Sequence, residues 1–291
     1  MVHSHNLGGR SMNVFITSDL HLHANEQGGD QATRQVAKEA CTRATENDVL
    51  LLLGDYGNSI QTITECLGLF AEFPGRKLAV VGNHDLWKIG QATTERYQQL
   101  QALFTSLGFI PLDRESTVIN GIGFVGSIGW YDYSFQDLKG VPSFAYEAKR
   151  LPRTGQVCWG DALRTNWGMG DAAVVEQQFT YLHEQIQSVS AAKRIIVGMH
   201  HVPTKKLLFH PRILVPTDWR FMNAFLGSER FGQLFSLYAS RISQVFCGHI
   251  HMHKRVIDRG VQYTSLGGDY NRKNLYIFDP ETHKSKRIIV K

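Results

Sequence analysis

The sequence has few cysteines, and their spacing suits neither a disulfide framework nor a thiolate metal site. Cys41, Cys66, Cys158 and Cys247 are spread over 291 residues and form no Cys-x-x-Cys pair. Disulfide-dependent secreted domains and closed zinc sites both need closely and regularly spaced cysteines. We therefore expect reduced thiols in a cytoplasmic protein, with Cys247 serving as a small buried hydrophobe.

Long apolar runs and dense runs of one charge are also missing from the sequence. No segment approaches the ~20 apolar residues of a membrane span, and residues 1–11 lack the apolar core of a secretory signal. We therefore expect no membrane partner. The net charge is +5, from 31 Lys and Arg against 26 Asp and Glu, which suits an anionic substrate. The Lys/Arg runs that are typical of dedicated nucleic-acid binders do not occur.

Apolar runs alternate with helix-like segments through the first half of the chain. The pattern predicts strands at 13–18, 49–54 and 77–82. Each strand is followed by a predicted helix, at 30–47, 59–72 and 91–107. This alternation indicates crossover connections and a largely parallel sheet, so the expected fold class is α/β. We interpret 12–291 as a single domain, and 1–11 as a disordered leader or a tag remnant.

The pattern changes in the second half of the chain. Asn120-Gly121 indicates a hairpin within 109–130, and 129–170 is rich in aromatic residues and glycine, typical of an irregular insertion that acts as a cap. Two similar segments there, "WGD" at 159–161 and "WGMGD" at 167–171, are interpreted as a chance likeness rather than a repeat. Further strands are predicted at 194–201, 244–248, 255–258, 261–266, 274–279 and 286–290, with helices at 176–189 and 228–240.

Polar residues of one kind follow five of the predicted strands. The five blocks are "SDLHLH" (18–23), "GDYGN" (54–58), "GNHD" (82–85), "GMHH" (198–201) and "GHIH" (248–251). In open α/β sheets the ligand site forms at the carboxyl ends of the strands. The five blocks should therefore converge on one site if their strands share a sheet.

The residue types in these blocks indicate a site for transition metals. Aspartate, asparagine and histidine offer oxygen and imidazole donors without thiolate, which suits Mn, Fe, Zn, Ni or Co rather than a closed structural zinc. Seven candidate ligands are too many for one tetrahedral ion, but they suit two ions ~3.5–4 Å apart that share a bridging carboxylate. The candidates are Asp19, His21, Asp55, Asn83, His200, His249 and His251.

The five blocks, in this order and each after a predicted strand, closely resemble the calcineurin-like metallophosphoesterase superfamily. The resemblance implies a two-sheet mixed β-sandwich flanked by helices, with the tail strands after 254 completing the second sheet. It also implies two divalent metal ions, Mn and/or Fe, with Zn, Ni or Co as alternatives. One ion would be held by Asp19, His21, Asp55 and His251, and the other by Asp55, Asn83, His200 and His249, with Asp55 bridging.

The same resemblance implies hydrolysis of a phosphomonoester or phosphodiester through in-line attack by a metal-bridging hydroxide. His84 would contact a phosphoryl oxygen or protonate the leaving group, and Asp85 would orient that imidazole or tune its charge. A small phosphorylated compound or a nucleotide is the expected substrate. The alternatives are a nuclease of the same superfamily, with nucleic acid as its partner, and a non-catalytic scaffold that has kept the fold.

Other histidines near these blocks receive secondary roles. His201 is the alternative to His200 as a ligand, although the side chains of adjacent residues diverge. His23 and His253 each lie two residues beyond a candidate ligand. We interpret both as surface residues, with a substrate contact as the alternative for His23 and the pocket rim as the alternative for His253.

Overall fold

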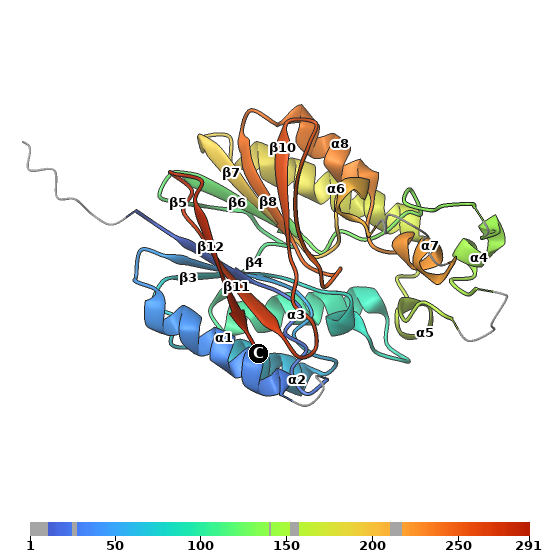
Figure 1. Ribbon diagram of the computed structural model, residues 1–291, viewed down its shortest axis with the longest axis horizontal. Coiled ribbons are helices and arrows are strands. Elements are labelled where there is room, and N and C mark those ends of the chain that lie inside the picture. Colours follow the sequence, from blue (N-terminus) through green and yellow to red (C-terminus); the bar gives the residue numbers. More distant parts are fainter. Residues whose placement is uncertain (1–10, 25–27, 140, 152–156, 210–216) are drawn as a thin grey trace, which may run out of the picture.

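Two stacked sheets with helices on their outer faces form the molecule (Figure 1). The computed structural model describes residues 11–24, 28–139, 141–151, 157–209 and 217–291. The predicted leader, apart from Ser11, lies outside the described residues. Each sheet has six strands and mixes parallel with antiparallel pairing, which confirms the predicted two-sheet mixed α/β sandwich.

The first sheet has the strand order β12-β11-β1-β2-β3-β4. The four strands of this sheet that come from the first half of the chain run parallel to one another. They are β1 Val14–Thr17, β2 Val49–Leu53, β3 Arg76–Val80 and β4 Phe109–Pro111. The crossovers between them are α1 Gly29–Arg43, α2 Ile60–Gly68 and α3 Thr93–Ser106, which cover the outer face of this sheet (Figure 1).

The second sheet has the strand order β5-β6-β7-β8-β10-β9. Strands β6, β7, β8 and β10 run parallel, while β5 and β9 form antiparallel edges. Its strands are β5 Thr117–Ile119, β6 Ile122–Ser127, β7 Arg194–Met199, β8 Ile242–Cys247, β9 His253–Asp258 and β10 Val261–Leu266, and its outer helices are α6 Asp171–Ser188 and α8 Glu229–Leu237. The predicted hairpin is confirmed, because Asn120 and Gly121 take positive φ values of 50° and 78° between β5 and β6.

Strand β2 shows why the inner strands read as continuous apolar runs. All five of its residues are buried. Leu51 and Leu53 pack between the two sheets with Phe124 of β6, whereas Leu50 and Leu52 pack on the side of the helices. A strand that is covered on both faces has no solvent side, so the usual alternation of apolar and polar residues disappears.

The last four strands divide between the two sheets, so the expectation that all of them complete the second sheet is wrong. β9 and β10 extend the second sheet, but β11 (Lys273–Phe278) pairs antiparallel with β1 and carries β12 (Ser285–Val290) at the edge of the first. Gly267 and Gly268 lie between β10 and β11 with φ values of 69° and 113°. Glycine permits this backbone, which takes the chain from one sheet to the other.

The segment predicted as an insertion lies at one end of the sandwich. It contains α4 Ser143–Glu147 and α5 Asp161–Arg164, and it lies beside α7 Thr217–Asn223 (Figure 1). Trp130, Tyr131 and Tyr146 from this segment are fully buried, and the ring of Tyr146 stacks on Phe221 of α7. The segment therefore contributes to the core as well as to the surface. Within the described part of the chain, no helix combines the length and apolar character needed to cross a bilayer.

Candidate metal centre

The five polar loops meet where the central parallel strands of both sheets end. Asp19 and His21 follow β1, Asp55 follows β2, and Asn83 begins the short 3-10 helix His84–Leu86 after β3. From the second sheet, His200 follows β7, and His249 and His251 follow β8. All seven predicted ligands are thus brought together, and five of them are buried: Asp19, His21, Asp55, Asn83 and His200.

Three of these side chains form what we call the first donor cluster: Asp19, His21 and His251. The Nε2 atoms of His21 and His251 lie 3.2 Å apart, and His251 Nε2 lies 3.5 Å from Asp19 Oδ1. The Oδ2 atom of Asp55 lies 3.6 Å from His21 Nε2. Donor atoms bound to one ion by ~2.1 Å bonds are separated by similar distances. The cluster therefore fits a metal ion.

The second donor cluster consists of Asn83, His200 and His249. His200 Nε2 lies 3.0 Å from Asn83 Oδ1, 3.2 Å from His249 Nδ1 and 3.4 Å from Asp55 Oδ1. The two carboxylate oxygens of Asp55 thus face different clusters, as a bridging ligand requires. In two groups the ligand atoms lie close enough together to hold one ion. The groups are Asp19, His21 and His251 in the first cluster, and Asp55, His200 and His249 in the second.

The hydrogen bonds around His200 leave lone pairs that converge on one point. Its Nδ1–H donates to Leu53 O at 2.8 Å, so Nε2 faces the other donors. Asn83 Oδ1 and Asp55 Oδ1, which are both acceptors, surround that nitrogen. Burial acts to lower the pKa of His200, but the adjacent Asp55 carboxylate outweighs it and raises that pKa to about 9. The Asp55 carboxylate therefore makes this point of the site favourable for a positive charge.

The backbone at the site is held in a conformation that most residues avoid. Asp19, His21, Asp55, His249 and His251 have positive φ values between 45° and 69°. Non-glycine residues rarely adopt this region, and each such residue costs about 1–3 kcal/mol. Backbone hydrogen bonds between loops maintain it: His21 N–H donates to Asp55 O, and His249 N–H to a carboxylate oxygen of Asp19. Strain of this kind concentrates at functional sites.

The glycines of the motifs are required by close approach of the loops. A Cβ atom on Gly82 would lie 2.2 Å from Asp55 Oδ1, and one on Gly248 would lie 2.8 Å from Asp19 Oδ2. Either contact would displace a carboxylate that faces the clusters. The glycine before Asn83 and the glycine before His249 are therefore part of the site.

The predicted pairing of Asp85 with the His84 ring is wrong. The buried Asp85 carboxylate accepts hydrogen bonds from four backbone N–H groups, those of Asp55, Tyr56, Gly57 and Gly82. Burial raises its pKa to about 7. Asp85 therefore fastens the loop after β2 to the loop after β3. An aspartate one residue after a histidine on a short 3-10 helix points away from that ring, which sequence spacing does not reveal.

His84 lies beside the first donor cluster and is half-buried. Its ring is 4.8 Å from the His21 ring and 3.6 Å from the Trp87 ring, on which it packs. Its backbone N–H donates to Asp55 Oδ1 at 2.9 Å. Among the described residues, no hydrogen bond reaches the His84 ring, so its nitrogens are available to a substrate.

Three further histidines considered in the sequence analysis lie outside the two clusters. His201 Nδ1–H donates to Ile128 O, although its ring lies 4.3 Å from the ring of His249. His23 is exposed and pairs with Asp30 and Glu65, and His253 Nδ1–H donates to Ser265 O. The placement of His200 rather than His201 among the donors follows the predicted preference.

The cysteines take no part in the site. All four are free thiols, as predicted, and Cys247 is buried in β8, where burial raises the pKa of its thiol.

Three residues near the centre were not singled out from the sequence. The Asp161 carboxylate accepts a hydrogen bond from Asn83 Nδ2 at 3.0 Å. Lys273 Nζ donates to Asp19 O at 2.8 Å, and the Tyr270 ring lies 4.9 Å from the His21 ring. Only the short "WGD" likeness pointed toward Asp161, and no local pattern marked Lys273 or Tyr270, which reach the site through the return of β11 to the first sheet.

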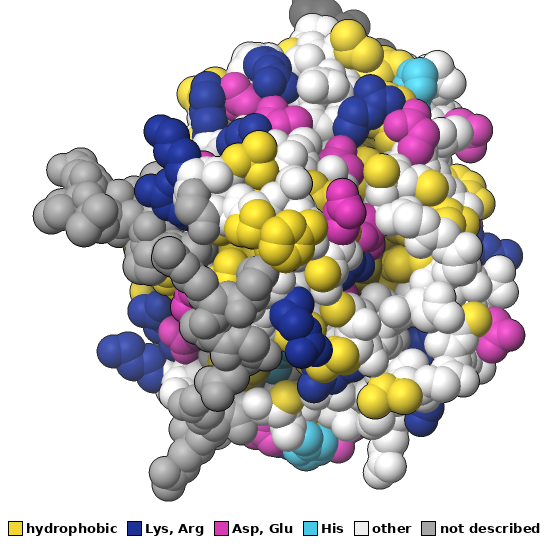
Figure 2. Space-filling model, turned by 90° about the vertical axis from the view of Figure 1, so that its right-hand side faces the viewer, with side chains coloured by type: hydrophobic (Ala, Val, Ile, Leu, Met, Phe, Trp, Pro, Cys, Tyr) yellow, Lys and Arg dark blue, Asp and Glu magenta, His cyan; other side chains and the backbone are white. Residues whose placement is uncertain are grey.

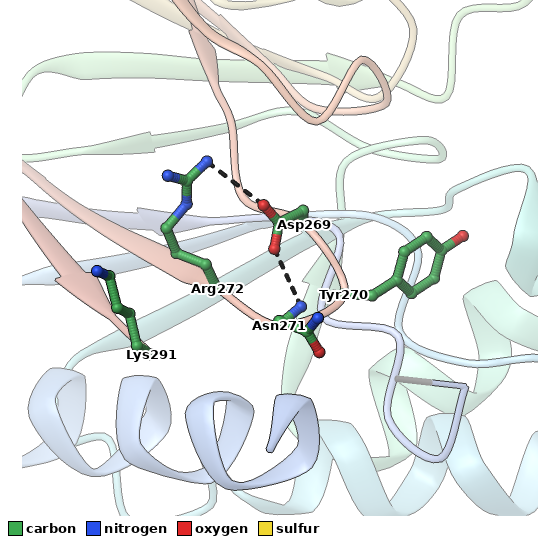
Figure 3. A pocket seen from close by; sticks show the side chains of 5 residues that line it. All are labelled: Asp269, Tyr270, Asn271, Arg272 and Lys291. Carbon is green, nitrogen blue, oxygen red and sulfur yellow. Dashed lines mark hydrogen bonds and ion pairs between the residues drawn. The ribbon is translucent and has the colours of Figure 1, made fainter. Parts of the chain in front are cut away.

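A cavity of about 550 Å³ lies against the loop that carries Tyr270. It is lined by Asp269, Tyr270, Asn271, Arg272 and Lys291 (Figure 3). In Figure 3 the Arg272 side chain bends back to Asp269, and the Tyr270 ring points to the opposite side. The loop thus places a cation on one side and an aromatic ring beside the candidate metal centre on the other.

Comparison with known proteins identifies the family of this chain. The family model of calcineurin-like phosphoesterases matches residues 12–253. Among solved structures, a phosphopantetheinyl hydrolase from Mycobacterium tuberculosis has 17% identity and a TM-score of 0.68, covering 90% of this chain and 90% of that chain. A putative 5'-nucleotidase from Staphylococcus aureus has 12% identity and a TM-score of 0.49, covering 97% of this chain and 54% of that chain. At 17% identity the likeness to the phosphopantetheinyl hydrolase concerns the fold alone. No curated protein sequence matches this chain.

Proposed function

We propose, from the premise that this chain belongs to the calcineurin-like phosphoesterase family, that it hydrolyses a phosphoric ester at the centre formed by the five loops. The observation that carries the proposal is Asp55, whose two oxygens face two separate donor clusters at 3.6 Å and 3.4 Å. This arrangement suits two metal ions that share a carboxylate. It supports an enzyme rather than a non-catalytic scaffold, because every donor of both clusters is in place.

The proposed ligand sets follow the two clusters. Asp19, His21 and His251 would hold one ion, and Asn83, His200 and His249 the other, with Asp55 between them. When bound, two divalent ions lower the pKa of water and neutralise the charge of the phosphoryl oxygens. Mn and Fe suit these oxygen and imidazole donors, as do Zn, Ni and Co, so metal availability decides among them.

His84 would act on the ester itself. Its ring is held in place by Trp87 at one edge of the first cluster and has no hydrogen-bond partner among the described residues. An imidazole in this position can donate a hydrogen bond to a phosphoryl oxygen or a proton to the leaving-group oxygen. The backbone N–H of His84 is occupied by Asp55, so the ring is the part that reaches the substrate.

We propose a small phosphorylated compound or a nucleotide as the substrate. The end of the molecule that carries α4, α5 and α7 shows basic, acidic and hydrophobic side chains interspersed (Figure 2). Over the described residues of that face, no continuous basic track follows a path for a nucleic-acid backbone, which a polymer substrate would need. The Tyr270 ring beside the centre offers a flat apolar surface for part of a small substrate.

The proposal is tested by a hydrolysis screen of p-nitrophenyl phosphate, its bis ester and nucleotides, with Mn, Fe, Ni and Zn each added to metal-free protein. We expect metal-dependent hydrolysis that is lost in His249→Ala. The matched control is His183→Ala, which removes a histidine that hydrogen-bonds Tyr238 on the outer helices. Full activity of purified His249→Ala with wild-type metal content would contradict the assignment. Salt-sensitive binding and cleavage of oligonucleotides would instead favour the nuclease.

A further inference from the structure

We propose that Asp161 is a positioning residue that sets both the orientation of the Asn83 amide and the place of the Trp87 ring beside His84. Asp161 lies at the start of α5 and is fully buried. Its Oδ1 atom accepts from Asn83 Nδ2 at 3.0 Å and from Trp87 Nε1 at 2.7 Å. Its Oδ2 atom accepts from Trp159 Nε1 at 2.7 Å. The inference rests on the proposed metal centre, because Asn83 matters here as a ligand.

The first consequence concerns which end of the Asn83 amide faces the donors. An ionised carboxylate only accepts hydrogen bonds, so the end of the amide that faces Asp161 is the NH2 group. The amide oxygen must then point the other way, toward His200 Nε2, from which it is 3.0 Å away. Without the carboxylate, a half-turn of the amide would present NH2 to the second donor cluster, and NH2 cannot ligate a cation.

The second consequence concerns the ring on which His84 packs. The hydrogen bond to Asp161 fixes the indole of Trp87, which lies 3.6 Å from the His84 ring. Two further contacts of that indole come from the region of α5. The Arg164 guanidinium lies 4.6 Å from the ring centre, and a Cβ atom on Gly160 would approach the ring to 2.8 Å. One carboxylate therefore holds the loop residues on both sides of His84.

A matched comparison is Asp171, which begins α6 directly after the insertion. Its carboxylate accepts from Trp130 Nε1 at 2.8 Å, from the Tyr133 hydroxyl and from Lys149 Nζ at 2.9 Å. It contacts none of the metal-cluster donors. The two segments "WGD" and "WGMGD" thus share one chemistry, an aspartate that accepts an indole N–H, but only Asp161 is connected to the centre. The Asp171→Ala variant therefore shows what the loss of an acceptor for an indole N–H does to the insertion, without a change at the donor clusters.

The first experiment measures Mn²⁺ affinity of the full chain by calorimetry in the wild type, Asp161→Ala and Asp171→Ala. We expect Asp161→Ala to weaken Mn²⁺ binding at the second donor cluster, to which Asn83 belongs, about 10- to 100-fold. A loss of this size is usual when a partner of a metal ligand is removed. Asp171→Ala should leave that affinity unchanged. Unchanged affinity in Asp161→Ala, or an equal loss in both variants, would overturn the inference. A wild type that binds no Mn²⁺ would instead contradict the proposed metal centre.

A second experiment remains decisive if Asp161→Ala does not fold. In Asp161→Asn, the amide oxygen can still accept from Asn83 and Trp87, but its NH2 group then meets the Trp159 N–H. Adding Trp159→Phe removes that conflict, so it should strengthen Mn²⁺ binding in the Asp161→Asn background. The same Trp159→Phe change in the wild type should leave binding equal or weaker, because it removes a hydrogen bond. An effect of Trp159→Phe with the same sign in both backgrounds would refute the role of Asp161.

Discussion

The two donor clusters share Asp55 but differ in how their ligands are held. In the second cluster, both His200 and Asn83 have a further partner that fixes their orientation, Leu53 O and the Asp161 carboxylate. In the first cluster, His21 Nδ1 is buried and has no hydrogen-bond partner among the described residues, and the His251 side chain is 25% exposed. Two of the three ligands of the second cluster are thus oriented in advance, although His249 Nε2 also lacks a partner among the described residues, while the first cluster is more open to solvent at His251.

This difference matters because partners of a metal ligand determine its orientation and affect metal affinity. A ligand that is already oriented loses little freedom when an ion binds, so the second cluster should retain its ion more tightly. The more exposed first cluster should exchange its ion with solution. Five motifs can therefore build two unequal sites, because the residues outside the motifs that contact the ligands differ.

The largest effect should come from removing what the two clusters share. Asp55→Asn replaces the bridging charge by a neutral amide, and we expect both ions to be lost and hydrolysis to fall at least ~10³-fold. Metal content by mass spectrometry and hydrolysis of p-nitrophenyl phosphate measure the two losses. Asp279→Asn, in the turn between β11 and β12, is the control and should behave as the wild type. Retention of two ions in Asp55→Asn would show that the carboxylate does not bridge.

A smaller effect should separate the clusters. After dialysis against a weak chelator, we expect the wild type and His21→Ala to keep one ion per chain. His200→Ala should keep none, and its Mn²⁺ affinity at the second cluster should fall at least about 10- to 100-fold. Metal content and Mn²⁺ calorimetry make the measurement. If His21→Ala and His200→Ala lose their ions at equal chelator concentration, the clusters are equivalent and the comparison fails.

The smallest effect on metal binding is expected from a change at Asp113, which lies outside both clusters. Asp113 joins the two sheets, because its carboxylate accepts from Val81 N–H after β3 and from Ile128 N–H after β6. Burial raises its pKa to about 6. The raised pKa means that the folded state holds this proton more tightly than the unfolded chain, whose aspartates titrate near ~3.9. The stability from this group is present below pH ~4 and is lost as the pH rises through ~6.

The corresponding test compares metal-free wild type with Asp113→Asn in denaturant titrations at several pH values. The unfolding free energy of the wild type, relative to that of Asp113→Asn, should fall by on the order of 1–3 kcal/mol between pH ~4 and ~7. Mn²⁺ affinity of the variant at neutral pH should stay close to that of the wild type. A difference that does not change with pH would mean that Asp113 titrates normally in the folded protein.

Much of the site could be predicted because its residues lie in short local patterns. Each donor follows an apolar strand directly, and parallel strands bring such positions to one edge. That logic placed Asp19 and Asp55 together at one edge of the first sheet, and His200 and His249 together at one edge of the second; the stacking of the two sheets then brings both groups to one site. Orientation was not predictable in this way: Asp85 was expected to hold the His84 ring, but it holds backbone N–H groups instead.

The fold shows a similar limit. The alternation of strands and helices predicted the parallel strands of the first half, and the Asn120-Gly121 turn predicted the β5–β6 hairpin. The alternating pattern of the tail strands does not say which sheet they join, because either sheet can bury one face of such a strand. The return of β11 to β1 depends on long-range pairing after Gly267 and Gly268.

By itself, the sequence determined the fold class, the chemistry of the donors and the loops that carry them. These properties are local, because residue types and the ends of strands can be recognised from short segments of sequence. The tertiary structure alone decided that the two oxygens of Asp55 face different clusters, and that Asp161 accepts from Asn83 across 78 residues of chain. Such contacts depend on how separate segments pack, and packing is a property of the whole chain.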